Sequence, residues 1–316
     1  MAPIGRLALP IPEFLVSPVL RNPLTGEPVL MAPTRAARPF DAGTVAVAQG
    51  CPFCPGNEAQ TPPELFVDRP GGGPPDSRGW LVRAFANRFP ALAPEEGVHE
   101  VVVNSPRHVA CLGDLTDEEV ARAVAVWALR LDAVANDPRG LWPFLFLNQG
   151  AAAGASLRHT HAQVVGLPFR PPRLVAHEAA FAEAARCPIC ADLEDAEARI
   201  VAAAEGLVTW CPRVPPLSGA VRIAPAEHTP DWGTALDAPA LARAVRRQTR
   251  RIREVLDDDS LNLYLNQRHP DGSDRFHWHV DLLPRVAALA GLELGAGVVA
   301  VTQTPEDTAT LLRGGA

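Results

Sequence analysis

Two stretches of the chain carry apolar residues at helical spacing, and each predicts one long helix. The first begins at about Thr116, where Thr116-Asp-Glu-Glu119 forms a capping box, and its apolar positions are Val120, Val124, Leu129 and Leu131. The second covers about Ala238 to Leu256, with a buried face of Leu241, Val245, Ile252 and Val255. A last helix is expected after Thr304-Pro305, because threonine caps helices and proline suits their first turn.

A strand–loop–strand pattern follows each long helix. The first strand of each pair ends in Leu-Asn-Gln, at residues 147–149 and 265–267. After a loop, two histidines alternate in His159-Thr-His161 and in His277-Trp-His279. Alternation places residues 159, 161 and 163 on one face of a strand.

These features occur twice in the same order, each time after a Cys-x2-Cys pair and a lone histidine (His108 or His228). We therefore predict a tandem pseudo-repeat of two related α+β domains, residues 1–175 and 176–316. The join lies near residues 168–186, where several prolines interrupt the chain. Neither half shows βαβ alternation, which favours antiparallel sheets with packed helices over a doubly wound parallel sheet.

The amino-acid composition excludes several classes of reaction and of binding partner. All 29 basic residues are arginine, so a Walker-type phosphate loop and any lysine-linked intermediate are excluded. The net charge of −7 and the lack of a basic run argue against nucleic-acid binding. Because no signal peptide or membrane span is visible, we expect a cytoplasmic protein that does not bind membranes.

The cysteine pairs predict two metal sites. Zinc prefers four tetrahedral thiolate or imidazole ligands, and a Cys-x2-Cys turn supplies two of them. The predicted ligands are Cys51, Cys54, His108 and His159 in the first half, and Cys187, Cys190, His228 and His277 in the second. Both sites would be closed and structural, with about two zinc ions per chain. The alternative is a pair of reduced or redox-active dithiols.

His161 is the candidate nucleophile. The loop Asn148 to Ser156 is rich in small residues, so its backbone N–H groups could approach an anion closely. A neutral imidazole attacks phosphorus well when its second ring nitrogen donates to a fixed acceptor. The alternative is that His161 is a packed core residue.

The run Asn148 to Gln163 resembles the active-site signature of galactose-1-phosphate uridylyltransferases, the nucleotidyltransferase branch of the histidine-triad superfamily. The segments 21–39, 51–58, 85–92 and 105–108 fit the same family in order. The resemblance implies two histidine-triad-like domains, a homodimer and a role in carbohydrate metabolism, specifically that of galactose.

The resemblance also implies a double displacement. His161 would attack the α-phosphorus of a nucleotide sugar such as UDP-glucose, release a sugar 1-phosphate, and pass the nucleotide to a second sugar 1-phosphate such as galactose 1-phosphate. Gln163 would contact the transferring phosphoryl group. The other implied substrate contacts are Gly154 and Ser156 at phosphate, Asn87 and Asn148 at the nucleotide, Arg21 near the phosphates across a dimer, and Glu293 at the hexose.

The chain departs from the family pattern at Thr160, Ala155 and Leu292, where proline, cysteine and an aromatic residue are usual. Its second Cys pair resembles a subgroup that includes ADP-glucose phosphorylases, which transfer AMP to inorganic phosphate. Two other functions therefore stay open: adenylyl transfer of that kind, and a non-enzymatic zinc-stabilised nucleotide-binding protein.

The second half repeats the histidine strand with different residues. His279 and Asp281 occupy the places of His161 and Gln163, but residues 269–274 lack the small-residue loop. We expect this site to be non-catalytic, with His279 either an added metal contact or a packed side chain. His99 and His177, which lie in no motif, are expected to be surface or fold residues.

Overall fold

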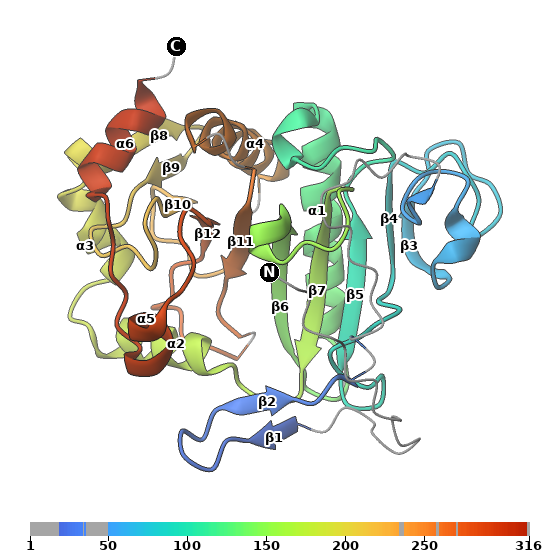
Figure 1. The fold of residues 1–316 in the computed structure, drawn as a ribbon, viewed down its shortest axis with the longest axis horizontal. Coiled ribbons are helices and arrows are strands. Elements are labelled where there is room, and N and C mark those ends of the chain that lie inside the picture. The colour runs from blue at the N-terminus through green and yellow to red at the C-terminus, as the bar shows by residue number, and fades with distance from the viewer. Residues whose placement is uncertain are drawn as a thin grey trace, which may run out of the picture.

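Ten antiparallel strands form one sheet that extends across the molecule (Figure 1). The computed structural model describes residues 19–33, 35, 50–233, 237–256, 259–269 and 271–314. The first half contributes β3 (Glu64–Asp68), β4 (Val82–Ala86), β5 (Val98–Val103), β6 (Trp142–Gln149) and β7 (His161–Leu167). The second half contributes β8 (Ile200–Ala204), β9 (Leu207–Trp210), β10 (Val221–Pro225), β11 (Leu261–Asn266) and β12 (His279–Pro284).

The strand order is β3-β4-β5-β7-β6-β11-β12-β10-β9-β8. Read outward from the central β6–β11 pair, the two halves follow the same order. The central pair is in register from Leu261 opposite Gln149 to Tyr264 opposite Phe146. The predicted α+β class with antiparallel strands is confirmed. The strand order agrees with a tandem repeat, while the repeat itself and the boundary at residue 175 stay predictions.

Two long helices cover one face of this sheet. They are α1 (Asp117–Ala135) and α4 (Ala238–Leu256), and both match the prediction from periodicity. The capping box is present, with the Thr116 hydroxyl accepting from the Glu119 N–H at 3.2 Å and Glu119 accepting from the Thr116 N–H at 2.7 Å. Helix and strand residues share one core, including Val124, Trp127, Leu131, Leu241, Val245, Ile252, Leu145, Leu147, Leu263 and Leu265.

Shorter elements complete the described chain. They are a hairpin of β1 (Val19–Arg21) and β2 (Pro28–Leu30), and the helices α2 (Pro172–Glu183), α3 (Pro188–Glu194), α5 (Gly291–Ala296) and α6 (Pro305–Arg313). Thr304 caps α6 as predicted, because its hydroxyl accepts from the Asp307 N–H at 3.1 Å. Among the described residues, no helix is both long enough and apolar enough to cross a membrane.

The histidine strands begin later than predicted. β7 begins at His161 and β12 at His279, so His159 and His277 precede their strands. The reason is that the Thr160 N–H donates to the Val109 carbonyl at 2.7 Å, in the loop before α1, rather than to a neighbouring strand. As a result, His159 lies in the loop before β7, whereas His161 lies in the strand.

Candidate active site and metal centres

The four predicted ligands of the first half meet at one point. The ligand atoms of Cys51, Cys54, His108 and His159 all lie within 4.8 Å of one another. His108 Nδ1 lies 3.3 Å from Cys54 Sγ, and His159 Nδ1 lies 3.7 Å from both sulfurs. Tetrahedral zinc bonded to sulfur and nitrogen separates these ligands by about 3.5 Å. We call these residues the first cluster, and their geometry fits a tetrahedral metal ion.

His159 is oriented as a metal ligand requires. Its Nε2–H donates to the Ser105 carbonyl at 2.8 Å, so the lone pair of the neutral ring lies on Nδ1 and faces the two sulfurs. Burial lowers the pKa of His159 to about 4, which keeps the ring neutral at pH 7.

The second cluster repeats this arrangement with Cys187, Cys190, His228 and His277, whose ligand atoms also lie within 4.8 Å of one another. His277 Nδ1 lies 3.6 Å from each sulfur, and His228 Nδ1 lies 3.8 Å from Cys190 Sγ. The Nε2–H groups of both histidines donate to backbone carbonyls at 3.1 Å. The second cluster is also suited to a tetrahedral ion, and burial lowers the pKa of His277 to about 4.

His161 is the first residue of β7 and is buried beside the first cluster. Its Nδ1–H donates to the His159 carbonyl at 2.8 Å. The lone pair of the neutral ring therefore lies on Nε2, the nitrogen that would attack. The rings of Phe53 and His161 pack edge to face, with ring centroids 5.1 Å apart. Phe53 lies between the two cysteines of the first cluster, so the Cys turn also fixes the position of His161.

Gln163 follows on the same face of β7 and contacts a side chain that the sequence did not single out. Its Oε1 lies 2.9 Å from His99 Nε2, on the neighbouring strand β5. Asn87, at the end of β4, places its Nδ2 3.1 Å from the same ring nitrogen. Of the two expectations for His99, a surface or a fold residue, the second is the one observed, because the side chain is buried on β5, between β4 and β7.

The small-residue loop bends back toward the sheet. Gly150 and Gly154 have φ values of +77° and +83° and flank a short 3-10 helix, Ala151–Ala153. The side-chain amide of Asn262, on β11, donates to Asn148 Oδ1 and to the Ala153 carbonyl, both at 2.9 Å. The second half of the sheet thus anchors the loop that carries Gly154 and the buried Ser156.

The remaining predicted contacts are more dispersed. Glu293, on α5, and Asn148 line one cavity of about 390 Å³, together with Phe144, Phe146, Tyr264 and Arg173. Arg21 lies on β1, outside the ten-stranded sheet, where its Nη1 donates to the Gly26 carbonyl at 3.1 Å. The motif residues 34 and 36–39 lie outside the described residues.

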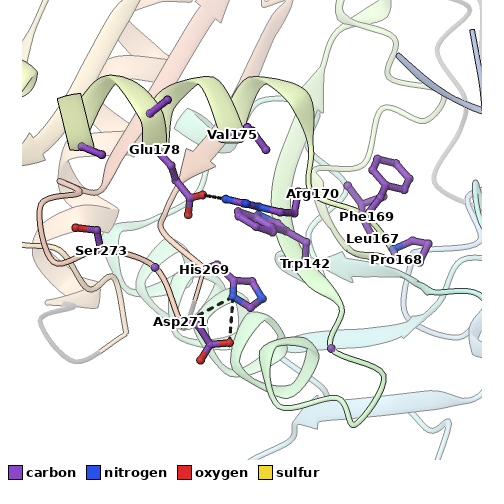
Figure 2. A pocket seen from close by; sticks show the side chains of 14 residues that line it. Trp142, Leu167, Pro168, Phe169, Arg170, Val175, Glu178, His269, Asp271 and Ser273 are labelled. Carbon is purple, nitrogen blue, oxygen red and sulfur yellow. Dashed lines mark hydrogen bonds and ion pairs between the residues drawn. The ribbon is translucent and has the colours of Figure 1, made fainter. Parts of the chain in front are cut away.

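A cavity of about 740 Å³ lies elsewhere (Figure 2). It is lined by Trp142 and Leu167, which pair at the opposite end of β6 and β7 from His161. Figure 2 shows Arg170 above Trp142 and extending to Glu178, with His269 on the other side of the indole. None of the predicted substrate contacts lines this cavity.

In the second half, other side chains pack around His279, the first residue of β12. His279 Nδ1–H donates to the His277 carbonyl at 3.0 Å, as in the first half. The rings of His177, Phe181 and Phe276 surround His279, with centroids 6.0 to 6.5 Å away. Burial lowers the pKa of His279 to about 3. Of the two alternatives for His279, the packed side chain is the one observed, since His279 is not among the ligand atoms of the second cluster.

Asp281 is held as a carboxylate in this closed site. Arg222 binds it through Nε at 2.7 Å and Nη2 at 3.2 Å, and the Asn266 amide donates to it at 3.0 Å. Burial opposes ionisation, but the Arg222 guanidinium holds the pKa of Asp281 below its usual range. The position that corresponds to Gln163 therefore carries a buried negative charge.

This chain is similar to proteins of known activity. Residues 83–171 match the family model for galactose-1-phosphate uridyl transferase, N-terminal domain. An ADP-glucose phosphorylase from Arabidopsis thaliana is 27% identical over 94% of this chain and 93% of that protein. A galactose-1-phosphate uridylyltransferase from Thermotoga maritima is 25% identical over 92% of this chain and 96% of that protein.

Solved structures give the same result. An ADP-glucose phosphorylase from Arabidopsis thaliana with bound ADP-glucose has a TM-score of 0.76 and 26% identity, covering 95% of this chain and 98% of that one. A uridylyltransferase structure also has a TM-score of 0.76, with 25% identity and coverage of 93% and 97%. Over almost its whole length the chain is similar to galactose-1-phosphate uridylyltransferases and ADP-glucose phosphorylases, and it is an enzyme of the nucleotidyltransferase type.

Proposed function

We propose that the enzyme transfers a nucleotidyl group from a nucleotide sugar through a covalent intermediate on His161. The observation that carries this proposal is the hydrogen bond from His161 Nδ1 to the His159 carbonyl, which places the lone pair on Nε2. Nε2 forms a bond to the α-phosphorus while the bond from that phosphorus to the bridging oxygen breaks. The sugar 1-phosphate leaves with the electron pair, and an incoming phosphate oxygen later displaces His161.

The surrounding residues have separate tasks in this scheme. The Gln163 amide donates to the phosphoryl group in transfer, where negative charge increases in the transition state. Gly154 and Ser156 supply the loop that approaches the phosphates, and Asn87 and Asn148 contact the nucleotide. Glu293 contacts the hexose, and Arg21 contacts the phosphates.

Uridylyl transfer between UDP-glucose and a hexose 1-phosphate such as galactose 1-phosphate is our first candidate reaction. The adenylyl alternative, with ADP-glucose and inorganic phosphate, is supported by the similarity to ADP-glucose phosphorylase along almost the whole chain. It is also supported by the second cluster, the feature that suggested this subgroup. The third possibility raised by the sequence, a nucleotide-binding protein without activity, is disfavoured by the similarity of almost the whole chain to a phosphorylase and a uridylyltransferase.

One labelling experiment separates these candidates. The protein is incubated with UDP-glucose or ADP-glucose labelled at the α-phosphorus, quenched without acid, and analysed for bound label. Label from UDP-glucose supports the first candidate, and label from ADP-glucose supports the second. No label from either nucleotide, or equal labelling of a His161→Ala variant, would overturn the covalent mechanism. His279→Ala is the matched control, which should label like the parent protein.

We further propose two structural zinc ions per chain and a homodimer. Zinc is the metal that suits tetrahedral sites of two thiolates and two imidazoles, and the observed ligand separations fit it. Apolar side chains around α5 are exposed in the single chain, including Leu292, Leu294 and Val298 at 52%, 73% and 54%. An exposed apolar surface next to Glu293 is suited to contact a second subunit.

A further inference from the structure

We infer that His99 is a positioning residue that orients the amide of Gln163 toward the transferring phosphoryl group. This inference rests on the proposed function. His99 lies on β5 and Gln163 on β7, on the same face of the sheet. Val101 is directly opposite Gln163, so His99 is its diagonal neighbour and can reach it across the strand pair.

The tautomer of His99 is determined by the backbone. The N–H of Ala91 donates to His99 Nδ1 at 2.9 Å, and a backbone N–H can only donate. The lone pair of the neutral ring therefore lies on Nδ1, and its proton lies on Nε2.

This proton decides how Gln163 is turned. Nε2–H needs an acceptor, and the atom at 2.9 Å is Gln163 Oε1. When the amide oxygen is bonded to His99, the amide NH₂ group is the end that can donate to substrate. An amide turned the other way would place its oxygen toward phosphate and oppose the reaction. His99 thus selects the donor end of Gln163.

Asn87 joins the same arrangement. Its Oδ1 accepts from the Phe89 N–H at 2.9 Å, which fixes its amide, and its Nδ2 lies 3.1 Å from His99 Nε2. Since both nitrogens carry hydrogens, this approach is a contact and not a hydrogen bond. Asn87 is the proposed nucleotide contact at the end of β4, and Gln163 is the proposed phosphoryl contact on β7. His99 lies between them, and because its single Nε2–H donates to Gln163, the ring orients Gln163 and not Asn87.

Two substitutions of His99 test this inference, because each keeps one half of the ring's hydrogen bonding. In His99→Gln the amide nitrogen can occupy the place of Nε2 and donate to Gln163. In His99→Asn the amide reaches the place of Nδ1 but not Gln163. We expect His99→Asn to lower kcat by about 10- to 100-fold with KM changed less than about 3-fold, and His99→Gln to recover most of the loss. His177→Asn, a like substitution in the second half, should leave kcat unchanged.

A double-mutant cycle asks whether His99 acts through Gln163. In a Gln163→Ala background, His99→Asn should change kcat less than about 2-fold, because the amide that it orients is gone. An undiminished loss in that background, or His99→Gln no better than His99→Asn, would contradict the inference. If the parent protein labels on His161 and His99→Asn labels at the same rate, the inference fails while the proposed function stands. Independently of activity, ¹⁵N chemical shifts that place the His99 proton on Nδ1 would overturn it.

Discussion

The buried pair of Arg222 and Asp281 allows a stability prediction that can be worked out from the structure. In Arg222→Met, the Asp281 carboxylate loses a two-point contact at 2.7 and 3.2 Å and keeps the hydrogen bond from the Asn266 amide at 3.0 Å. Removing one partner of a buried ion pair costs about 3–5 kcal/mol, because the other charge stays buried. At about 2–4 °C per kcal/mol, the thermal midpoint should fall by roughly 6–20 °C.

The loss of stability in Arg222→Met should depend on pH in a defined direction. In the parent protein the pKa of Asp281 lies below its usual range, so the pair stabilises the fold above about pH 4 and this contribution is lost as pH falls through the folded pKa. In Arg222→Met, burial without the guanidinium raises this pKa above its unfolded value. The stability deficit of the variant should therefore be largest near neutral pH and should decrease as pH is lowered toward 5.

The assay is thermal unfolding followed by circular dichroism, for parent and variant at pH 5 to 8, with the difference between them as the measured quantity. Arg222→Met/Asp281→Leu is the matched control, since it removes both charges and should recover most of the lost stability. A single variant within 1 kcal/mol of the parent, or a double variant no more stable than the single one, would refute this reasoning.

Three further predictions concern other parts of the molecule. Cys190→Ser should lower the zinc content from about two ions to one per chain by elemental analysis, whereas Cys111→Ser, at a buried thiol outside both clusters, should keep two. Gly150→Ala should lower the thermal midpoint and slow the labelling of His161, because its φ is +77° and the new Cβ would lie 2.6 Å from the Ser260 Cα. Leu294→Arg should shift the protein from dimer to monomer in light scattering, and a dimer of undiminished stability would contradict the proposed interface.

The sequence predicted the features that depend on local pattern or on ligand chemistry. Helices α1 and α4 follow directly from periodicity, and the eight predicted cysteine and histidine ligands gather in two groups as their types and spacing indicated. Contacts that depend on which strands pair were not predicted from the sequence. His99 and Gln163 are 64 residues apart and meet only because β5 and β7 pair in one register. The available signal was a pair of polar residues, His99 and Glu100, inside an otherwise apolar strand.

The two histidine strands share one tautomer but differ in charge, and this difference supports the expectation that only the first is reactive. In both His161 and His279, the Nδ1–H group donates to the carbonyl of the residue two positions earlier. Both rings therefore have the tautomer of a nucleophile. They differ in the residue two positions later. Gln163 is neutral, and its contact with His99 turns a donor toward the phosphoryl group. Asp281 is an anion paired with Arg222, and an ionised carboxylate only accepts hydrogen bonds, so it offers an incoming phosphoryl group no donor. The rings of Phe181 and Phe276 also pack against His279, with centroids 6.5 and 6.2 Å away, and residues 269–274 lack the small-residue loop, so charge, packing and loop sequence all support the expectation that this strand is non-catalytic.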